Sequence, residues 1–230
     1  MSVVTEIKVW SGGAMRRFMV EAVPLFERES GNKVALRFGP TRELKKEIEE
    51  GAAFDVALLP RWAVDQLVAA GKIAAGTPTD AVRSLVGFVT RAAASKPDIG
   101  TVEALKNVLR QARSISYSRG PSGEYVAELI ERLGLAAEMK DKTLFAIGRP
   151  VAEVVAKGEA EVGMQQIIEI LPVEGAALVG PLPGELRNFV LYTTRLAADA
   201  ADRAPARAFV GFLASPEAVR IIRAKGMEPG

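Results

Sequence analysis

Short apolar runs alternate with amphipathic segments along most of the chain. Residues 7–10 form a short strand pattern, and residues 16–30 then carry apolar side chains at helical spacing. A second strand is predicted over 34–38, followed by a short charged helix over 42–50. The apolar run over 56–59 is typical of a strand that is buried on both faces. This βαβαβ order predicts a parallel sheet with right-handed crossovers.

The same rhythm restarts near Asp98, after a longer strand pattern over 84–90. Thr41 and Thr101 are suitable N-caps for the helices that follow them, and Pro150 suits a first helical position. The remaining segments are predicted as strands over 114–117, 143–146, 161–165, 177–182 and 189–193, and as helices over 101–112, 124–133, 150–156, 167–171, 205–213 and 216–225.

The turns at the carboxyl ends of the predicted strands are the candidate ligand site. Ligands of open α/β sheets bind at this edge. Several of these turns are rich in glycine and lead directly into a helix, whose first N–H groups and partial positive charge favour an anion. Arginine side chains near the turns suit carboxylates. The candidate ligand-binding residues are Ser11, Gly12, Gly13, Ala14, Thr41, Arg42, Pro60, Arg119, Ser122, Gly148, Arg149, Gln165 and Gln166.

Composition narrows the chemistry. The 230 residues, of which 49% are hydrophobic, suit two lobes of roughly 100 residues each. The chain has no histidine and no cysteine, so Ser-His-Asp triads, Cys-His dyads and the usual zinc sites lack their parts. Any proton transfer falls to Glu, Asp, Lys or Tyr side chains. We expect no cofactor and no metal.

Charge and the N-terminus bear on partners and location. The net charge is +2 with no block of like charge, so no nucleic-acid surface is indicated. No apolar run approaches a membrane span, so no membrane insertion is expected. The first residues lack a signal-peptide pattern, which predicts a cytoplasmic protein as written, or a periplasmic one if a leader was removed. We expect a monomer.

The order of the residues resembles the molybdate-binding proteins of ABC transporters, within the class II periplasmic binding protein fold. The likeness is carried by Val9-Trp10-Ser11-Gly12-Gly13-Ala14-Met15 and by residues 26–31, 34–44, 48–51, 55–56, 158–163 and 212–216. The resemblance implies two lobes, each a mostly parallel sheet flanked by helices, with a ligand cleft between them. Lobe 1 would comprise 1–82 and 188–230 and lobe 2 would comprise 83–187, with crossovers near 80–87 and 183–189.

The resemblance also implies a ligand set. That family holds its oxyanion through two serine hydroxyls, two backbone amides and a tyrosine hydroxyl. Those points fall on Ala14, with Ser11 nearby, and on Thr41, Pro60, Gly148 and Gln166. Three of them have changed chemistry, and Pro60 has no N–H to donate. We therefore expect weak molybdate binding and a small mono- or dicarboxylate ligand, of which an aromatic acid is one form.

Three functions stay open at this point. The preferred one is a solute-binding protein of an ABC-type uptake system, with a permease as partner. The alternative is a cofactor-free cytoplasmic isomerase, decarboxylase or hydrolase of a small carboxylic acid, with Glu124, Tyr125 and Glu169 as catalytic candidates. The third is a ligand-sensing domain of a regulator, which is disfavoured because no helix-turn-helix segment is evident.

Overall fold

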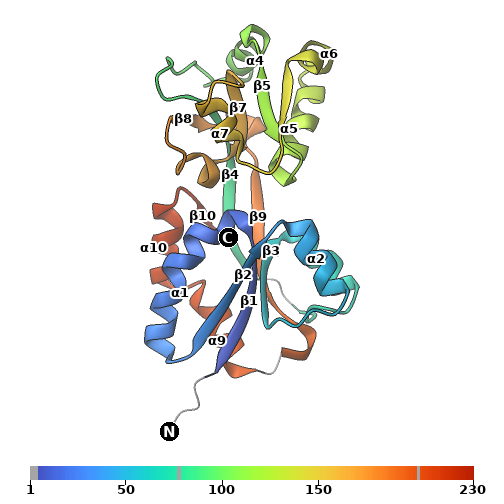
Figure 1. The fold of residues 1–230 in the computed structure, drawn as a ribbon, viewed down its shortest axis with the longest axis vertical. Coiled ribbons are helices and arrows are strands. Elements are labelled where there is room, and N and C mark those ends of the chain that lie inside the picture. Colours follow the sequence, from blue (N-terminus) through green and yellow to red (C-terminus); the bar gives the residue numbers. More distant parts are fainter. Residues whose placement is uncertain (1–4, 77–78, 201–202) are drawn as a thin grey trace. The chain divides into compact units, whose positions relative to one another are not determined.

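The computed structural model describes residues 5–76, 79–200 and 203–230 (Figure 1). The chain divides into two compact units. Unit 1 comprises Met1–Arg83 and Leu191–Gly230, and unit 2 comprises Ser84–Val190. Strand β4 (Thr79–Arg91) begins in unit 1 and ends in unit 2, whereas β9 (Phe189–Leu196) begins in unit 2 and ends in unit 1.

Unit 1 contains a mostly parallel sheet. β1 (Glu6–Gly12) pairs in parallel with β2 (Lys33–Gly39) on one side and with β3 (Val56–Pro60) on the other. β9 pairs with β3 in the antiparallel direction, and β10 (Glu228–Pro229) pairs with β4 in the same way. Every residue of β3 is buried, as its apolar run predicted. The parallel pairs confirm the predicted βαβαβ start of the chain.

The helices of unit 1 bury one apolar face each. In α1 (Arg16–Ser30), residues Phe18, Ala22 and Phe26 are buried at helical spacing, and Gly31 ends the helix with a φ of 73°. Phe26 packs against Phe209 and Phe212, with ring centroids 5.0 and 5.6 Å away. The other helical segments are the 3-10 turns η1 (Gly13–Met15) and η4 (Ala198–Ala200), and α2 (Thr41–Glu49), α3 (Arg61–Ala69), α9 (Ala204–Phe212) and α10 (Pro216–Ala224).

Unit 2 has a mixed sheet. β7 (Val162–Gln166) pairs antiparallel with β4 and parallel with β5 (Ile115–Ser118), and β6 (Thr143–Ala146) extends the parallel part beyond β5. β8 (Ala176–Pro181) pairs antiparallel with β4. The helical segments are α4 (Val102–Gln111), α5 (Pro121–Arg132), α6 (Ala136–Met139), η2 (Lys140–Lys142), α7 (Val151–Ala156), α8 (Ile167–Ile170) and η3 (Gly184–Leu186).

The predicted starts of α2 and α7 are each wrong by one residue, and α5 begins at Pro121, three residues before its predicted start. Pro40, not Thr41, is the N-cap of α2, and its carbonyl accepts hydrogen bonds from the N–H groups of Glu43 and Leu44. Pro150 likewise precedes α7 instead of opening it. Both prolines have extended ψ angles, 133° and 143°, so each lies just outside its helix. The N-cap prediction for Thr101 is confirmed, since its hydroxyl accepts a hydrogen bond from the Ala104 N–H at 3.1 Å.

Short elements escaped the sequence prediction. α6, η2 and β10 span four, three and two residues, too few for a periodic pattern to appear. Among the described residues, no helix has both the length and the apolar character needed to cross a membrane.

Candidate functional site

The strand ends of unit 1 bring several predicted residues together. Gly12 closes β1 and pairs with Gly39, the last residue of β2. A Cβ built on Gly12 would lie 3.3 Å from Cε1 of Tyr192, 3.6 Å from Oγ1 of Thr41 and 4.0 Å from Cδ of Pro60. Gly12, Thr41 and Pro60 therefore line one small region of unit 1, as the sequence predicted.

Two helices begin at this edge without a side-chain cap. The N-cap residues of α2 and α3 are Pro40 and Pro60, whose side chains make no capping hydrogen bond. By contrast, Thr101 caps α4 and Ser215 caps α10 with their hydroxyls. The first turns of α2 and α3 thus receive no acceptor from an N-cap side chain, and a helix start of this kind suits an anionic ligand or water.

The N-terminal loop is less suited to a tetrahedral anion than the resemblance implied. Ser11 is fully buried, and its hydroxyl donates to the Gly12 carbonyl at 3.4 Å. Gly13 and Ala14 lie in η1, where Ala14 is partly exposed and offers no hydroxyl. Pro60 is buried at the end of β3 and has no N–H.

Arg42 is positioned by an aromatic neighbour at the same edge. Its guanidinium carbon lies 5.8 Å from the ring centroid of Trp62, the second residue of α3. Nearby Arg61 is held by two carboxylates: Nη1 donates to Asp80 and Nε to Asp65, at 3.0 and 3.1 Å. A ligand carboxylate at Arg61 would therefore have to displace the two carboxylates that already hold it.

Tyr192 is a site residue that the sequence reasoning missed. It is 3% exposed and lies opposite Pro60 in the β3–β9 register. The next residue, Thr193, donates to Oδ1 of Asp80 at 3.0 Å, which ties β9 to the start of β4. Only the knowledge that β9 returns antiparallel beside β3 could have placed this tyrosine, and no local pattern carries that information.

The turn before α5 in unit 2 is tightly built. The Gly120 N–H donates to the Ser118 hydroxyl at 3.2 Å. A Cβ on Gly123 would lie 1.8 Å from the Ser118 carbonyl oxygen, so only glycine lets α5 approach this closely. Ser122 is buried, whereas Arg119 is exposed with its guanidinium carbon 4.6 Å from the Phe145 ring centroid.

Gln165 and Glu169 form a hydrogen-bonded chain on the start of α7. Oε1 of Gln165 accepts from the Ala152 N–H at 2.9 Å, and the Gln165 side chain also bonds to Glu169. Glu169 keeps part of its surface exposed, but burial of its carboxyl raises its pKa above the usual 4.5, and the bond to Gln165 opposes that shift. Gln166, which follows Gln165 in the sequence, is buried at the end of β7.

Other unit 2 candidates have partners of their own. Arg149 forms a two-pronged ion pair with Glu159, which raises the pKa of Arg149 and lowers that of Glu159. Tyr125 donates its hydroxyl to the Leu186 carbonyl at 2.8 Å. Gly148 is exposed with a φ of 69°, and Glu124 is exposed in the first turn of α5. The structure therefore gives Arg149 and Tyr125 structural partners and leaves their proposed ligand or catalytic roles as predictions.

The sequence of this chain matches a known protein family. The profile of the bacterial extracellular solute-binding proteins matches residues 7–228. This chain belongs to that family. It is 31% identical over 232 residues to an aconitate isomerase from Pseudomonas sp, covering 98% of this chain and 88% of that protein. It is 27% identical over 220 residues to the molybdate-binding protein ModA of Azotobacter vinelandii, covering 90% of this chain and 84% of ModA. The resemblance to molybdate-binding proteins is thereby confirmed.

Solved structures of solute-binding proteins share the fold. The periplasmic molybdate-binding protein of Azotobacter vinelandii superposes with a TM-score of 0.73 at 20% identity, covering 96% of this chain and 98% of that one. The sulfate-binding protein SubI of Mycobacterium tuberculosis gives 0.77 at 17% identity, covering 98% and 87%. These neighbours confirm the predicted two-lobe α/β periplasmic-binding-protein fold.

Proposed function

We propose that this solute-binding protein takes a small organic polycarboxylate of the aconitate class. The observation that carries the proposal is Pro60, buried at the start of α3 beside Thr41 and Gly12. An N–H that would serve an inorganic oxyanion is absent at this point, whereas Arg42 lies at the same edge. The relative named aconitate isomerase supports a carboxylic acid as the ligand.

Energetics favour a carboxylate over molybdate at this edge. A desolvated tetrahedral dianion loses about 1.5–3 kcal/mol for each charge-assisted hydrogen bond that is not made. Pro60 and Ala14 each remove one donor, and the Ser11 hydroxyl donates to the Gly12 carbonyl. A carboxylate instead needs two parallel donors, which a guanidinium supplies in one plane, while further carboxylates suit the uncapped starts of α2 and α3.

Family membership supports delivery of the ligand to an ABC permease as the role. The contributions of Arg119, Ser122, Gln166 and the other unit 2 candidates to the same ligand stay predictions. Single substitutions of these residues, each followed by calorimetric titration with trans-aconitate, test these contributions.

Isothermal titration calorimetry on protein freed of carried ligand tests the proposal. The panel comprises trans-aconitate, cis-aconitate, citrate, molybdate and tungstate. We expect at least one tricarboxylate to bind with micromolar affinity or better, and both oxyanions to bind at least about tenfold more weakly. Sub-micromolar molybdate binding would refute the proposal. So would the absence of a measurable heat of binding for every carboxylate in the panel.

A second candidate function, isomerisation of the same ligand, is favoured by Glu169. Moving the double bond of aconitate requires a base to remove a proton from the methylene carbon and an acid to return one to the former alkene carbon, with no net change in composition. Burial raises the pKa of the Glu169 carboxyl, so it holds its proton to higher pH than an exposed glutamate, as a general acid requires. The chain has no histidine to take that role.

Proton NMR of trans-aconitate in D2O tests this second candidate. We expect cis-aconitate to appear with deuterium at the methylene carbon, and Glu169→Gln to slow both changes by roughly a hundredfold or more. If the protein binds trans-aconitate but produces neither change on long incubation, the isomerase is excluded and the binding role stands alone.

A further inference from the structure

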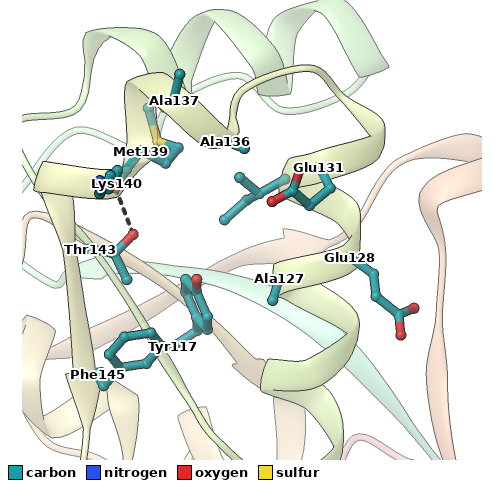
Figure 2. Close-up of a pocket in the computed structure, with 11 residues that line it drawn as sticks. Tyr117, Ala127, Glu128, Glu131, Ala136, Ala137, Met139, Lys140, Thr143 and Phe145 are labelled. Carbon is teal, nitrogen blue, oxygen red and sulfur yellow. Dashed lines mark hydrogen bonds between the residues drawn. The ribbon is translucent and has the colours of Figure 1, made fainter.

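A pocket of about 660 Å³ lies wholly within unit 2, between the β5–β6 end of the sheet and helices α5 and α6 (Figure 2). Its volume falls in the range of small-molecule sites. Its lining includes none of the residues assigned above to the carboxylate site. It is therefore a feature that the proposed function does not use.

The pocket combines buried apolar residues with Phe145, which is 42% exposed. The rings of Tyr117 and Phe145 meet edge to face, with centroids 5.2 Å apart at 79°. Ile130 and Met139 are 4% and 1% exposed and line the walls. Thr143 contributes little polarity, because its hydroxyl already donates to the Met139 carbonyl at 2.8 Å. An apolar group of a ligand fits this floor.

Tyr117 places a hydroxyl without a protein partner at the base of the pocket. The residue is only 9% exposed, and its hydroxyl points into the pocket (Figure 2). It makes no hydrogen bond to any residue in the described part of the chain. This hydroxyl can donate to, or accept from, a ligand or water in the pocket.

Two exposed residues of opposite charge also line the pocket. Glu131 comes from α5, and Lys140 comes from the segment that follows α6 (Figure 2). Neither forms an ion pair with the other or with another described residue. Glu128, one turn before Glu131 on α5, also lines the pocket, although its carboxylate extends away from Tyr117 and Glu131 (Figure 2). The pocket thus offers one anionic and one cationic group to a single occupant.

We propose that this pocket binds an apolar α-amino acid in its zwitterionic form. The ammonium group pairs with Glu131 and the carboxylate with Lys140, while the side chain lies on Tyr117, Phe145 and Met139. The Tyr117 hydroxyl donates to the ligand carboxylate. The proposal does not rest on the carboxylate site in unit 1 and concerns a separate ligand.

Titration calorimetry with L-phenylalanine and L-leucine tests the proposal, with phenethylamine and 3-phenylpropionate as analogues that lack one charge each. We expect saturable binding of an amino acid in the micromolar to low millimolar range. Each analogue should bind roughly tenfold more weakly, because it leaves one charged wall unpaired. Equal binding of either analogue, or no saturable binding of either amino acid at millimolar concentrations, would overturn it.

Variants on the two walls sharpen the test. Glu131→Gln and Lys140→Gln should each weaken amino-acid binding by about tenfold, and Tyr117→Phe by about threefold or more. Glu185→Gln, at an exposed residue of η3 outside the pocket lining, is the matched control and should leave the affinity unchanged. A loss with Glu185→Gln as large as with Glu131→Gln would contradict the assignment. All four variants should bind trans-aconitate like the parent, so failure of one proposal is distinguishable from failure of the other.

Discussion

Tyr192 lies against Gly12, although the two residues belong to strands from opposite ends of the chain. A Cβ added at Gly12 would be 3.3 Å from Cε1 of the Tyr192 ring. The contact exists because β9 returns antiparallel beside β3, which places Tyr192 opposite Pro60. The ring of Tyr192 thereby closes one side of the region lined by Thr41 and Pro60.

Gly12→Ala should weaken ligand binding with a limited effect on folding. Gly12 has φ and ψ of −57° and 143°, which any residue adopts, so only the crowding of the Tyr192 ring changes. We expect the trans-aconitate affinity to fall by roughly threefold to tenfold. The free energy of unfolding should fall by no more than about 3 kcal/mol. Gly180→Ala is the control, because its Cβ meets nothing within 4 Å. Parent-like affinity in Gly12→Ala would show that this ring contact does not shape the site.

Gly123→Ala should be strongly destabilising, whereas Gly211→Ala should not. Both glycines lie in helices, but a Cβ on Gly123 would meet the Ser118 carbonyl oxygen at 1.8 Å, and one on Gly211 would meet nothing within 4 Å. Gly211→Ala gains up to about 1 kcal/mol from helix propensity. Gly123→Ala should lose at least about 2 kcal/mol, because the turn and α5 must move apart. Urea unfolding of the two variants measures the contrast, and equal stabilities would refute it.

Arg42→Gln should lower carboxylate affinity more than Arg149→Gln. Arg149 is engaged by both carboxylate oxygens of Glu159, so a ligand would have to displace an existing ion pair. We expect about a tenfold or larger loss of trans-aconitate affinity for Arg42→Gln, and less than about twofold for Arg149→Gln. Titration calorimetry on both variants decides the point. The reverse order would make Arg149 the ligand arginine.

Pro60→Ala should raise the affinity for molybdate. The substitution restores a backbone N–H at the start of α3, at the position where molybdate-binding relatives are expected to supply an amide donor. One additional charge-assisted hydrogen bond predicts a gain of roughly tenfold. Titration with molybdate and tungstate checks it, with stability measured in parallel because loss of a proline costs up to about 1 kcal/mol. No gain for either oxyanion would show that Pro60 does not set the ligand class.

Glu169→Gln should stabilise the protein increasingly as the pH rises. Because burial raises the pKa of Glu169 in the folded state, the native protein holds a proton that the unfolded chain releases above its ordinary pKa of 4.5. The contribution of this group to stability is therefore full below that value and is lost as the pH rises through the folded pKa. The variant lacks this dependence, so its unfolding free energy relative to the parent should increase as the pH rises above the ordinary value of 4.5. A constant difference in urea unfolding across that range would contradict the shift.

The sequence by itself determined the type and order of most elements. Apolar spacing placed α1 and the buried β3, and a glycine with left-handed φ ended α1 at Gly31, because burial of one face and backbone sterics act within a few residues. The same local reasoning collected Gly12, Thr41 and Pro60, since carboxyl ends of neighbouring parallel strands share one edge. Chain composition also excluded histidine and cysteine chemistry before any coordinate was needed.

Only the tertiary structure decided which distant side chains meet. The pairing of β9 with β3 brought in Tyr192, and the return of the chain after α7 gave Arg149 its partner Glu159. The pocket of Tyr117, Glu131 and Lys140 likewise depends on how α5 and α6 cover the end of one sheet. Periodicity records which face of an element is buried, but not what it is buried against. That choice is made by the packing of all elements together, and no short segment carries it.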